Sequence, residues 1–293
     1  MNWNSLALMT GIIFLYSFQT LFCTLYDRYY PGRPEWTSPV FCILESGIIV
    51  LITWALNGFH FHPSPLTLLF GALNALMLFG YNISIIEAGK RGSFAFFNVA
   101  KSYGSILVPL GYSVLFLREG TSVPQWIGVG LMLIAFLLMN REDNAFEKPK
   151  KGYWVFCALL FFTNGMYSVF VKMQTVVSEG ESAEMIMLTF GIMGILAAIR
   201  LFGAERSGAL RAFRQTRRSA VFLAACLVSA ALAVNGMVYI LPHLNSVVYF
   251  TAVNGGVLLL SCLYAFLLFH EKPTVRKIVG MLAAIVSVTL LSL

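Results

Sequence analysis

Two ionisable residues lie in the middle of long apolar stretches of this sequence. Glu45 interrupts residues 39–57, and Lys101 interrupts residues 92–117. A charge placed in hydrocarbon costs about 2.5 kcal/mol or more, so charges inside apolar segments most often serve a function. Lys101 would neutralise a carboxylate or phosphate on a solute, and Glu45 would carry a proton or attract a cation. Alternatively, the two residues form a buried ion pair that only fixes packing.

Amides and hydroxyls recur in the same kind of stretch. Asn98 precedes Lys101 by three positions and therefore shares its helix face. Asn254 is followed by two glycines, which permit close approach of a ligand or another backbone. The same amide would otherwise join two helices by a hydrogen bond. The candidate solute-binding residues are Lys101, Glu45, Asn98, Asn254, Thr251, Tyr249, Asn164 and Gln19.

The composition indicates which kind of element positions these residues. Of the 293 residues, 58% are hydrophobic and 11% are charged, whereas soluble domains have about 45–50% and about 25%. A soluble globule could not cover so much apolar surface. Five scattered Cys residues argue against a disulfide scaffold. The basic residues that give the net charge of +7 lie in loops between apolar stretches, which does not favour a nucleic-acid-binding domain.

The apolar stretches predict an all-α integral membrane protein with ten transmembrane helices. A helix needs about 20 apolar residues to cross a bilayer and satisfies its own backbone hydrogen bonds. Ten segments approach that length, at residues 5–26, 39–57, 66–88, 92–117, 123–140, 153–171, 185–202, 219–241, 246–269 and 276–293.

The sequence also contains an internal repeat. Gly104 and Gly256 are 152 residues apart, and Gly128 and Gly280 have the same separation. We therefore expect two five-helix halves, residues 1–140 and 153–293, joined by a charged linker at 141–152. An odd number of spans in each half makes the two copies run in opposite senses across the bilayer. Inverted repeats of this kind are typical of secondary transporters.

The basic residues bear on orientation. Of the 20 Lys and Arg residues, all except Lys101, Arg118 and Lys172 lie in or next to the odd-numbered loops between predicted spans. The positive-inside rule places those loops in the cytoplasm and both termini outside.

Two motifs with the same spacing in both halves carry a family resemblance. Residues 115–119 read Leu-Phe-Leu-Arg-Glu and are followed by Ile127-Gly128. Residues 267–272 read Leu-Leu-Phe-His-Glu-Lys and are followed by Val279-Gly280. Over its whole length the chain resembles the EamA-like, ten-helix members of the drug/metabolite transporter superfamily. The resemblance implies secondary transport of small metabolites, with the fifth and tenth helices outside the transport path. It also implies cytoplasmic termini, which conflicts with the charge distribution.

From these features we expect a secondary active transporter in a cell membrane, and more specifically in a bacterial inner membrane. It would move a small polar metabolite, such as an amino acid, by alternating access. A proton or sodium ion would be the coupling ion, and the chain could form a homodimer. One alternative is a proton-coupled exporter of cationic drugs that uses Glu45. An alternative of another class is a non-transporting assembly or lipid-handling subunit.

The sequence does not predict an enzyme. Its four His residues lie at span ends or in loops, without the spacing of metal ligands, and there is no Gly-rich phosphate-binding loop. We therefore expect neither a cofactor, nor a metal, nor a nucleic-acid partner.

Overall fold

The chain folds into helices. The computed structural model describes residues 3–89, 91, 94–118, 120–140, 150–178, 180–204, 209–268 and 274–291, and these residues contain no strand. The helices are α1 (Trp3–Tyr29), α2 (Pro34–Leu56), α3 (Pro65–Gly89), α4 (Phe94–Leu115), α5 (Val123–Asn140), α6 (Tyr153–Val177), α7 (Ser182–Ala204), α8 (Arg217–Ile240), α9 (Ser246–Leu267) and α10 (Val275–Leu291), with short 3-10 helices at Ala209–Phe213 and Leu241–His243.

The helices have the length and surface expected in a bilayer. In the described part of the chain, α1, α2, α3, α6, α7, α8 and α9 are long and apolar enough to cross a membrane, and α5 is a shorter apolar helix. Large apolar side chains point outward, such as Ile195 and Ile199 of α7 at 62% and 64% exposure. Lipid would cover such side chains, whereas water would not stabilise them. These features are those of a multi-pass membrane protein.

Local sequence signals account for several helix ends. Helix α2 begins earlier than predicted because Pro34 occupies its first turn, where a missing backbone N–H costs nothing. It ends before Gly58 and Phe59, which both have positive φ. The Thr216 side chain caps α8 by accepting from the Ser219 backbone N–H. Helix α7 continues past Arg200, whose side chain is exposed close to the helix end.

The chain divides into two compact units, and each takes residues from both sequence halves. Unit 1 comprises Met1–Ile13, Gly80–Lys172 and His243–Leu293, and unit 2 comprises Phe14–Phe79 and Met173–Pro242. The predicted division into halves concerns sequence repeats, which is a different property, and it stays a prediction. Residues 141–149 of the predicted linker lie outside the described residues.

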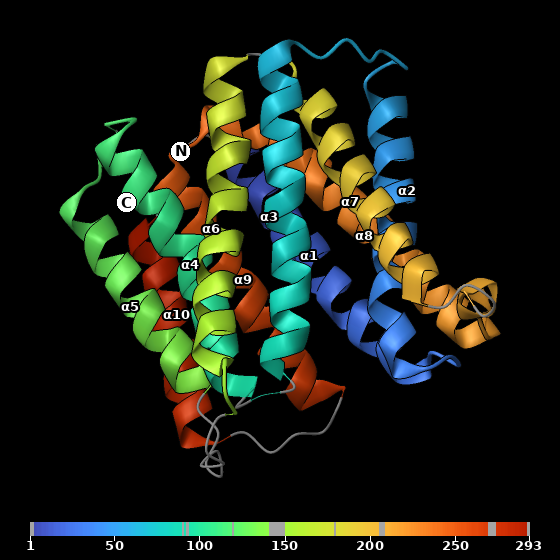
Figure 1. Ribbon diagram of the computed structural model, residues 1–293. Coiled ribbons are helices and arrows are strands. Elements are labelled where there is room, and N and C mark those ends of the chain that lie inside the picture. The colour runs from blue at the N-terminus through green and yellow to red at the C-terminus, as the bar shows by residue number, and fades with distance from the viewer. Residues whose placement is uncertain are drawn as a thin grey trace. The chain divides into compact units, whose positions relative to one another are not determined.

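In unit 1, α5 and α10 run side by side (Figure 1). A Cβ added to Gly128, near the start of α5, would lie 3.1 Å from the carbonyl oxygen of Ser287, near the end of α10. A Cβ added to Gly280, near the start of α10, would lie 3.2 Å from the carbonyl oxygen of Ala135 in α5. The start of each helix therefore meets the later part of the other, so the two are antiparallel. Ala135 and Ser287 are 152 residues apart, as Gly128 and Gly280 are.

Glycines also bring α6 and α1 close to their neighbours in unit 1. Gly104 of α4 faces the backbone of Phe161 in α6, and Gly165 of α6 faces the carbonyl of Gly104. Gly256 of α9 faces Ile13 of α1. Gly104 and Gly256, and likewise Ile13 and Gly165, are 152 residues apart. Two contacts between different helices thus use equivalent positions.

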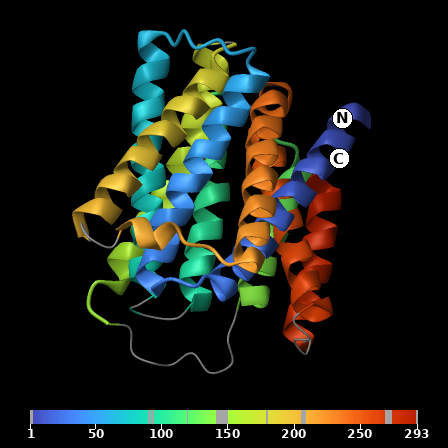
Figure 2. The ribbon, with the colours of Figure 1, turned by 90° about the vertical axis from the view of Figure 1, so that its right-hand side faces the viewer.

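Unit 2 is built around α2. This helix packs along α7, and the two run next to each other in both views (Figures 1 and 2). It also packs against α8. Gly194 of α7 lies against the side chain of Ser46, and Gly71 of α3 lies against Leu188. Unit 2 is therefore held together by helices from residues 14–79 and 173–242 that pack across the sequence.

The contact at Gly104 predicts a large effect of one added methyl group. In Gly104→Ala the new Cβ collides with the Phe161 carbonyl, and a backbone group cannot rotate away as a side chain can. We therefore expect the free energy of unfolding to fall by about 1–3 kcal/mol. Gly111→Ala in the same helix is the matched control, because nothing lies within 4 Å of a Cβ there. Thermal unfolding in detergent should show a lower Tm for Gly104→Ala and an unchanged or higher Tm for Gly111→Ala. Equal Tm values for the two variants would contradict the close packing of α4 on α6.

Candidate functional site

Lys101 lies on α4 in unit 1 and is half-buried. Its Nζ is 5.9 Å from the ring centroid of Tyr81, which is within the range of a cation–π interaction. Its backbone carbonyl accepts a hydrogen bond from Asn164 Nδ2 of α6 at 2.9 Å. The structure therefore brings two predicted site residues, Lys101 and Asn164, together, but through the backbone of Lys101. The side chain of Asn98 lies outside the described part of the chain.

Three further predicted residues lie on α9 in unit 1. Tyr249 and Thr251 are buried, and their hydroxyl oxygens have no hydrogen-bonding partner among the described residues. Asn254 donates to the carbonyl of Phe250 at 2.7 Å, a bond within its own helix. Buried hydroxyls without partners are costly, so this part of α9 is a candidate for contact with a polar ligand.

Glu45 and Gln19 meet in unit 2. Gln19 Nε2 of α1 donates to Glu45 Oε1 of α2 at 3.1 Å. The backbone carbonyl of Gln19 accepts from the thiol of Cys226 in α8 at 3.3 Å. A neutral amide is thus the partner of the carboxyl group, and no Lys or Arg among the described residues of unit 2 forms an ion pair with it. The arrangement leaves Glu45 able to hold a proton or to attract a cation.

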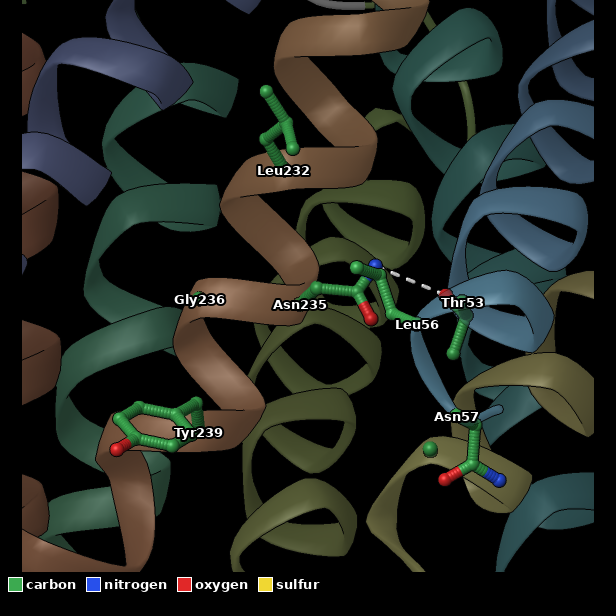
Figure 3. A pocket seen from close by; sticks show the side chains of 8 residues that line it. Thr53, Leu56, Asn57, Leu232, Asn235, Gly236 and Tyr239 are labelled. Carbon is green, nitrogen blue, oxygen red and sulfur yellow. Dashed lines mark hydrogen bonds between the residues drawn. The ribbon is translucent and has the colours of Figure 1, made fainter. Parts of the chain in front are cut away.

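Unit 2 also contains a pocket of about 370 Å³ near the ends of α2 and α8 (Figure 3). The walls are Thr53, Leu56 and Asn57 from the end of α2, Leu232, Asn235 and Tyr239 from α8, and the start of α7. The pocket is mainly apolar with a few polar groups, which is the usual character of small-molecule sites.

Hydrogen bonds hold both amides of the pocket in place. Asn235 Nδ2 donates to Thr53 Oγ1 at 3.0 Å and to the Ala231 carbonyl at 2.8 Å. Asn57 Nδ2 donates to the His60 carbonyl and to Glu184 Oε1, each at 2.9 Å. The two Asn side chains are therefore fixed by the protein, and so is the direction in which their oxygens point.

A second group of polar residues links α3, α6 and the start of α7 in unit 2. Glu181 Oε2 accepts from the hydroxyl of Thr67 and from the backbone N–H of Ser64. Gln174 Nε2 of α6 donates to the same Thr67 hydroxyl at 2.7 Å. The hydrogen bonds from Thr67 and Ser64 hold the pKa of Glu181 below its ordinary value of 4.5. These bonds fasten the loop before α7 to the start of α3.

Sequence analysis identified part of this arrangement. It named Gln19 and Glu45, which are in contact, and Lys101 and Asn164, which are joined through a backbone carbonyl. It did not name Thr53, Asn57 or Glu184 as site residues, because polar residues at helix ends are ordinary caps. Their available signal was the spacing of Thr53 and Asn57, four residues apart on one helix face.

Comparison with known proteins identifies the fold and leaves the function open. No family model matches the chain, and no curated protein matches it. A solved structure described as "Crystal structure of protein" aligns with 100% of this chain and 99% of its own, with a TM-score of 0.76 and 14% sequence identity. At this identity the similarity establishes a shared fold.

The Glu181 contacts predict a stability change with pH. The folded-state pKa lies below the unfolded one, so the carboxylate stabilises the fold above about pH 4.5. This contribution disappears as the pH falls through the lowered folded-state pKa. Between pH 6 and pH 3 we expect the Tm of the native protein to fall further than that of Glu181→Gln. Glu35→Gln, a change at an exposed residue in α2, should behave like the native protein. Parallel curves for Glu181→Gln and the native protein would contradict this role.

Proposed function

We propose that this protein is a secondary active transporter of a small polar metabolite, with ten transmembrane helices in two inverted halves, as in EamA-like members of the drug/metabolite transporter superfamily. The coupling ion would be a proton or sodium, and the membrane a bacterial inner membrane. The observation that carries the proposal is the reciprocal contact between α5 and α10.

That contact supports an inverted repeat. Gly128 approaches Ser287 in the same way as Gly280 approaches Ala135, and each residue of the first pair is replaced in the second by the residue 152 positions away. Such reciprocity is the property of a two-fold axis. Because the two equivalent helices are antiparallel, the axis would relate halves that run in opposite senses across the membrane.

Other helix pairs support the same interpretation. Helix α2 packs on α7 and α4 packs on α9, and each pair joins helices of the same rank in the two predicted halves. The equivalent glycine contacts of α4 with α6 and of α9 with α1 agree with it. This interpretation makes α4, α5 and α10 transmembrane helices as well.

Transport by alternating access needs bodies that can move, and polar groups that can receive a solute at membrane depth. The chain has two compact units, each made of helices from both halves. Unit 1 carries Lys101 on α4, and unit 2 carries Glu45 on α2. Ionisable residues inside apolar membrane helices most often serve a function, so we assign these two residues to solute or coupling-ion binding.

Reconstitution tests the proposal. Native protein in proteoliposomes should exchange at least one labelled solute from a panel of amino acids and other small metabolites. Lys101→Ala and Glu45→Gln should each reduce that exchange by about tenfold or more, because each removes a charge-assisted interaction. Glu35→Gln, at an exposed residue, serves as the control and should exchange at the native rate.

The outcomes separate the alternatives. Normal exchange in both Lys101→Ala and Glu45→Gln would overturn the assignment of these residues. A proton-coupled exporter of cations is the second candidate, because Glu45 is paired with a neutral amide. It predicts that Glu45→Gln abolishes transport of a cationic drug while Lys101→Ala leaves it unchanged. No exchange of any solute by well-folded native protein would overturn the proposed function.

A further inference from the structure

The pocket between α2 and α8 in unit 2 contains two side-chain amides, those of Asn57 and Asn235, and each presents its oxygen as a hydrogen-bond acceptor. A side-chain amide has two N–H hydrogens and one oxygen. Both hydrogens of Asn57 are used, by the His60 carbonyl and by Glu184. Both hydrogens of Asn235 are used as well, by Thr53 and by the Ala231 carbonyl. Each amide therefore has only its oxygen available for a ligand.

The network also determines which end of each amide is the oxygen. Reversing Asn57 would place its oxygen against the His60 carbonyl and the Glu184 carboxylate, and all of these groups are acceptors. Reversing Asn235 would place its oxygen against the Ala231 carbonyl. Both alternatives oppose acceptor to acceptor, so the assigned orientation is the one that the surroundings select.

The oxygens border the pocket from two helices. In Figure 3 the Asn57 oxygen lies on the side that faces α8, and the Asn235 oxygen points away from Thr53. Leu56, Leu232 and the ring of Tyr239 supply apolar surface around them. None of the described residues that line the pocket is Lys or Arg. A ligand would therefore meet two amide oxygens, an aromatic face and the hydroxyl-bearing side chains of Thr53 and Tyr239.

A carboxyl group lies directly behind one of these amides. Glu184 is 7% exposed and bonds to Asn57 through Oε1, whereas its Oε2 has no hydrogen-bonding partner among the described residues. A negative charge at this position would polarise the Asn57 amide, making its oxygen a stronger acceptor. It would also favour a cation in the pocket, because a charge screened by little water acts over several ångströms.

We propose that this pocket binds the ammonium group of a small protonated amine. The ammonium N–H groups donate to the oxygens of Asn57 and Asn235, the carbon chain packs on Leu56 and Leu232, and Glu184 supplies the compensating charge. An anion would face the two amide oxygens and the charge of Glu184, with only the hydroxyl-bearing side chains of Thr53 and Tyr239 as donors. A neutral alcohol would donate one hydrogen bond with no gain from Glu184. This proposal is independent of the proposed function, because amine binding can be measured on purified protein whether or not the protein transports a solute.

The first test compares four ligands of similar size on purified native protein in detergent at pH 7, by isothermal titration. Butylammonium should bind, whereas butan-1-ol and butyrate should bind at least about tenfold more weakly. Tetramethylammonium has the charge but no N–H group, so it should also bind more weakly. Equal binding of butan-1-ol or butyrate, or no binding of butylammonium, would overturn the proposal. Equal binding of tetramethylammonium would overturn the role of the amide oxygens.

Variants then locate the site. Glu184→Gln keeps an oxygen for Asn57 but removes the charge, and Asn235→Ala removes one acceptor. Each should weaken butylammonium binding by about tenfold, with gel filtration and the Tm without ligand as checks of folding. Asn74→Ala is the matched control: this in-span amide of the same unit bonds to Thr189 and lies outside the pocket lining. Native affinity in both Glu184→Gln and Asn235→Ala would show that the amine binds elsewhere and would overturn the assignment. Loss of transport in Lys101→Ala together with native butylammonium affinity would support an amine-binding pocket that does not depend on Lys101.

Discussion

Polar side chains on apolar helices must find their hydrogen bonds within the protein, and this constraint determines much of the structure. A polar group buried without a partner costs several times what an average hydrogen bond contributes. Gln19 therefore turns to Glu45, Asn235 to Thr53 and Asn164 to a carbonyl of α4. These bonds join different helices, so they also decide which helix faces meet. Within the described part of the chain, the few buried groups that lack partners, such as the hydroxyls of Tyr249 and Thr251, stand out against this background.

Close packing imposes the second requirement, and small residues meet it. Without a hydrophobic force between helices in lipid, association depends on close contact between backbones. Gly104 lets α4 reach the backbone of α6, and Gly128 and Gly280 let α5 and α10 lie close together along their lengths. The Ser287 hydroxyl adds a hydrogen bond to the carbonyl of Gly128 at 2.6 Å. Each of these glycines stands where a larger side chain would push two helices apart.

The polar groups of unit 2 fall into two roles. The bonds among Ser64, Thr67, Gln174 and Glu181 tie loops and helix ends together. The bonds of Asn57 and Asn235 also hold two helices together, but their unused oxygens remain at an open pocket. The same amide group can thus stabilise the fold through its N–H groups and offer its oxygen to a ligand. Fixing an amide in this way prepares it for binding without a further loss of side-chain entropy.

Composition and spacing alone determined that this is an all-helical, multi-pass membrane protein, because apolar stretches of span length have few other uses. They also singled out Glu45 and Lys101, since charges inside such stretches are rare. The partners of those residues were not predictable: Gln19 meets Glu45 only through the packing of α1 on α2. The pocket was hidden for the same reason, because Thr53, Asn57 and Asn235 lie on helices far apart in the chain and look like ordinary caps or helix contacts. Which donors are used and which acceptors remain is a property of three-dimensional contacts, so the tertiary structure decided it.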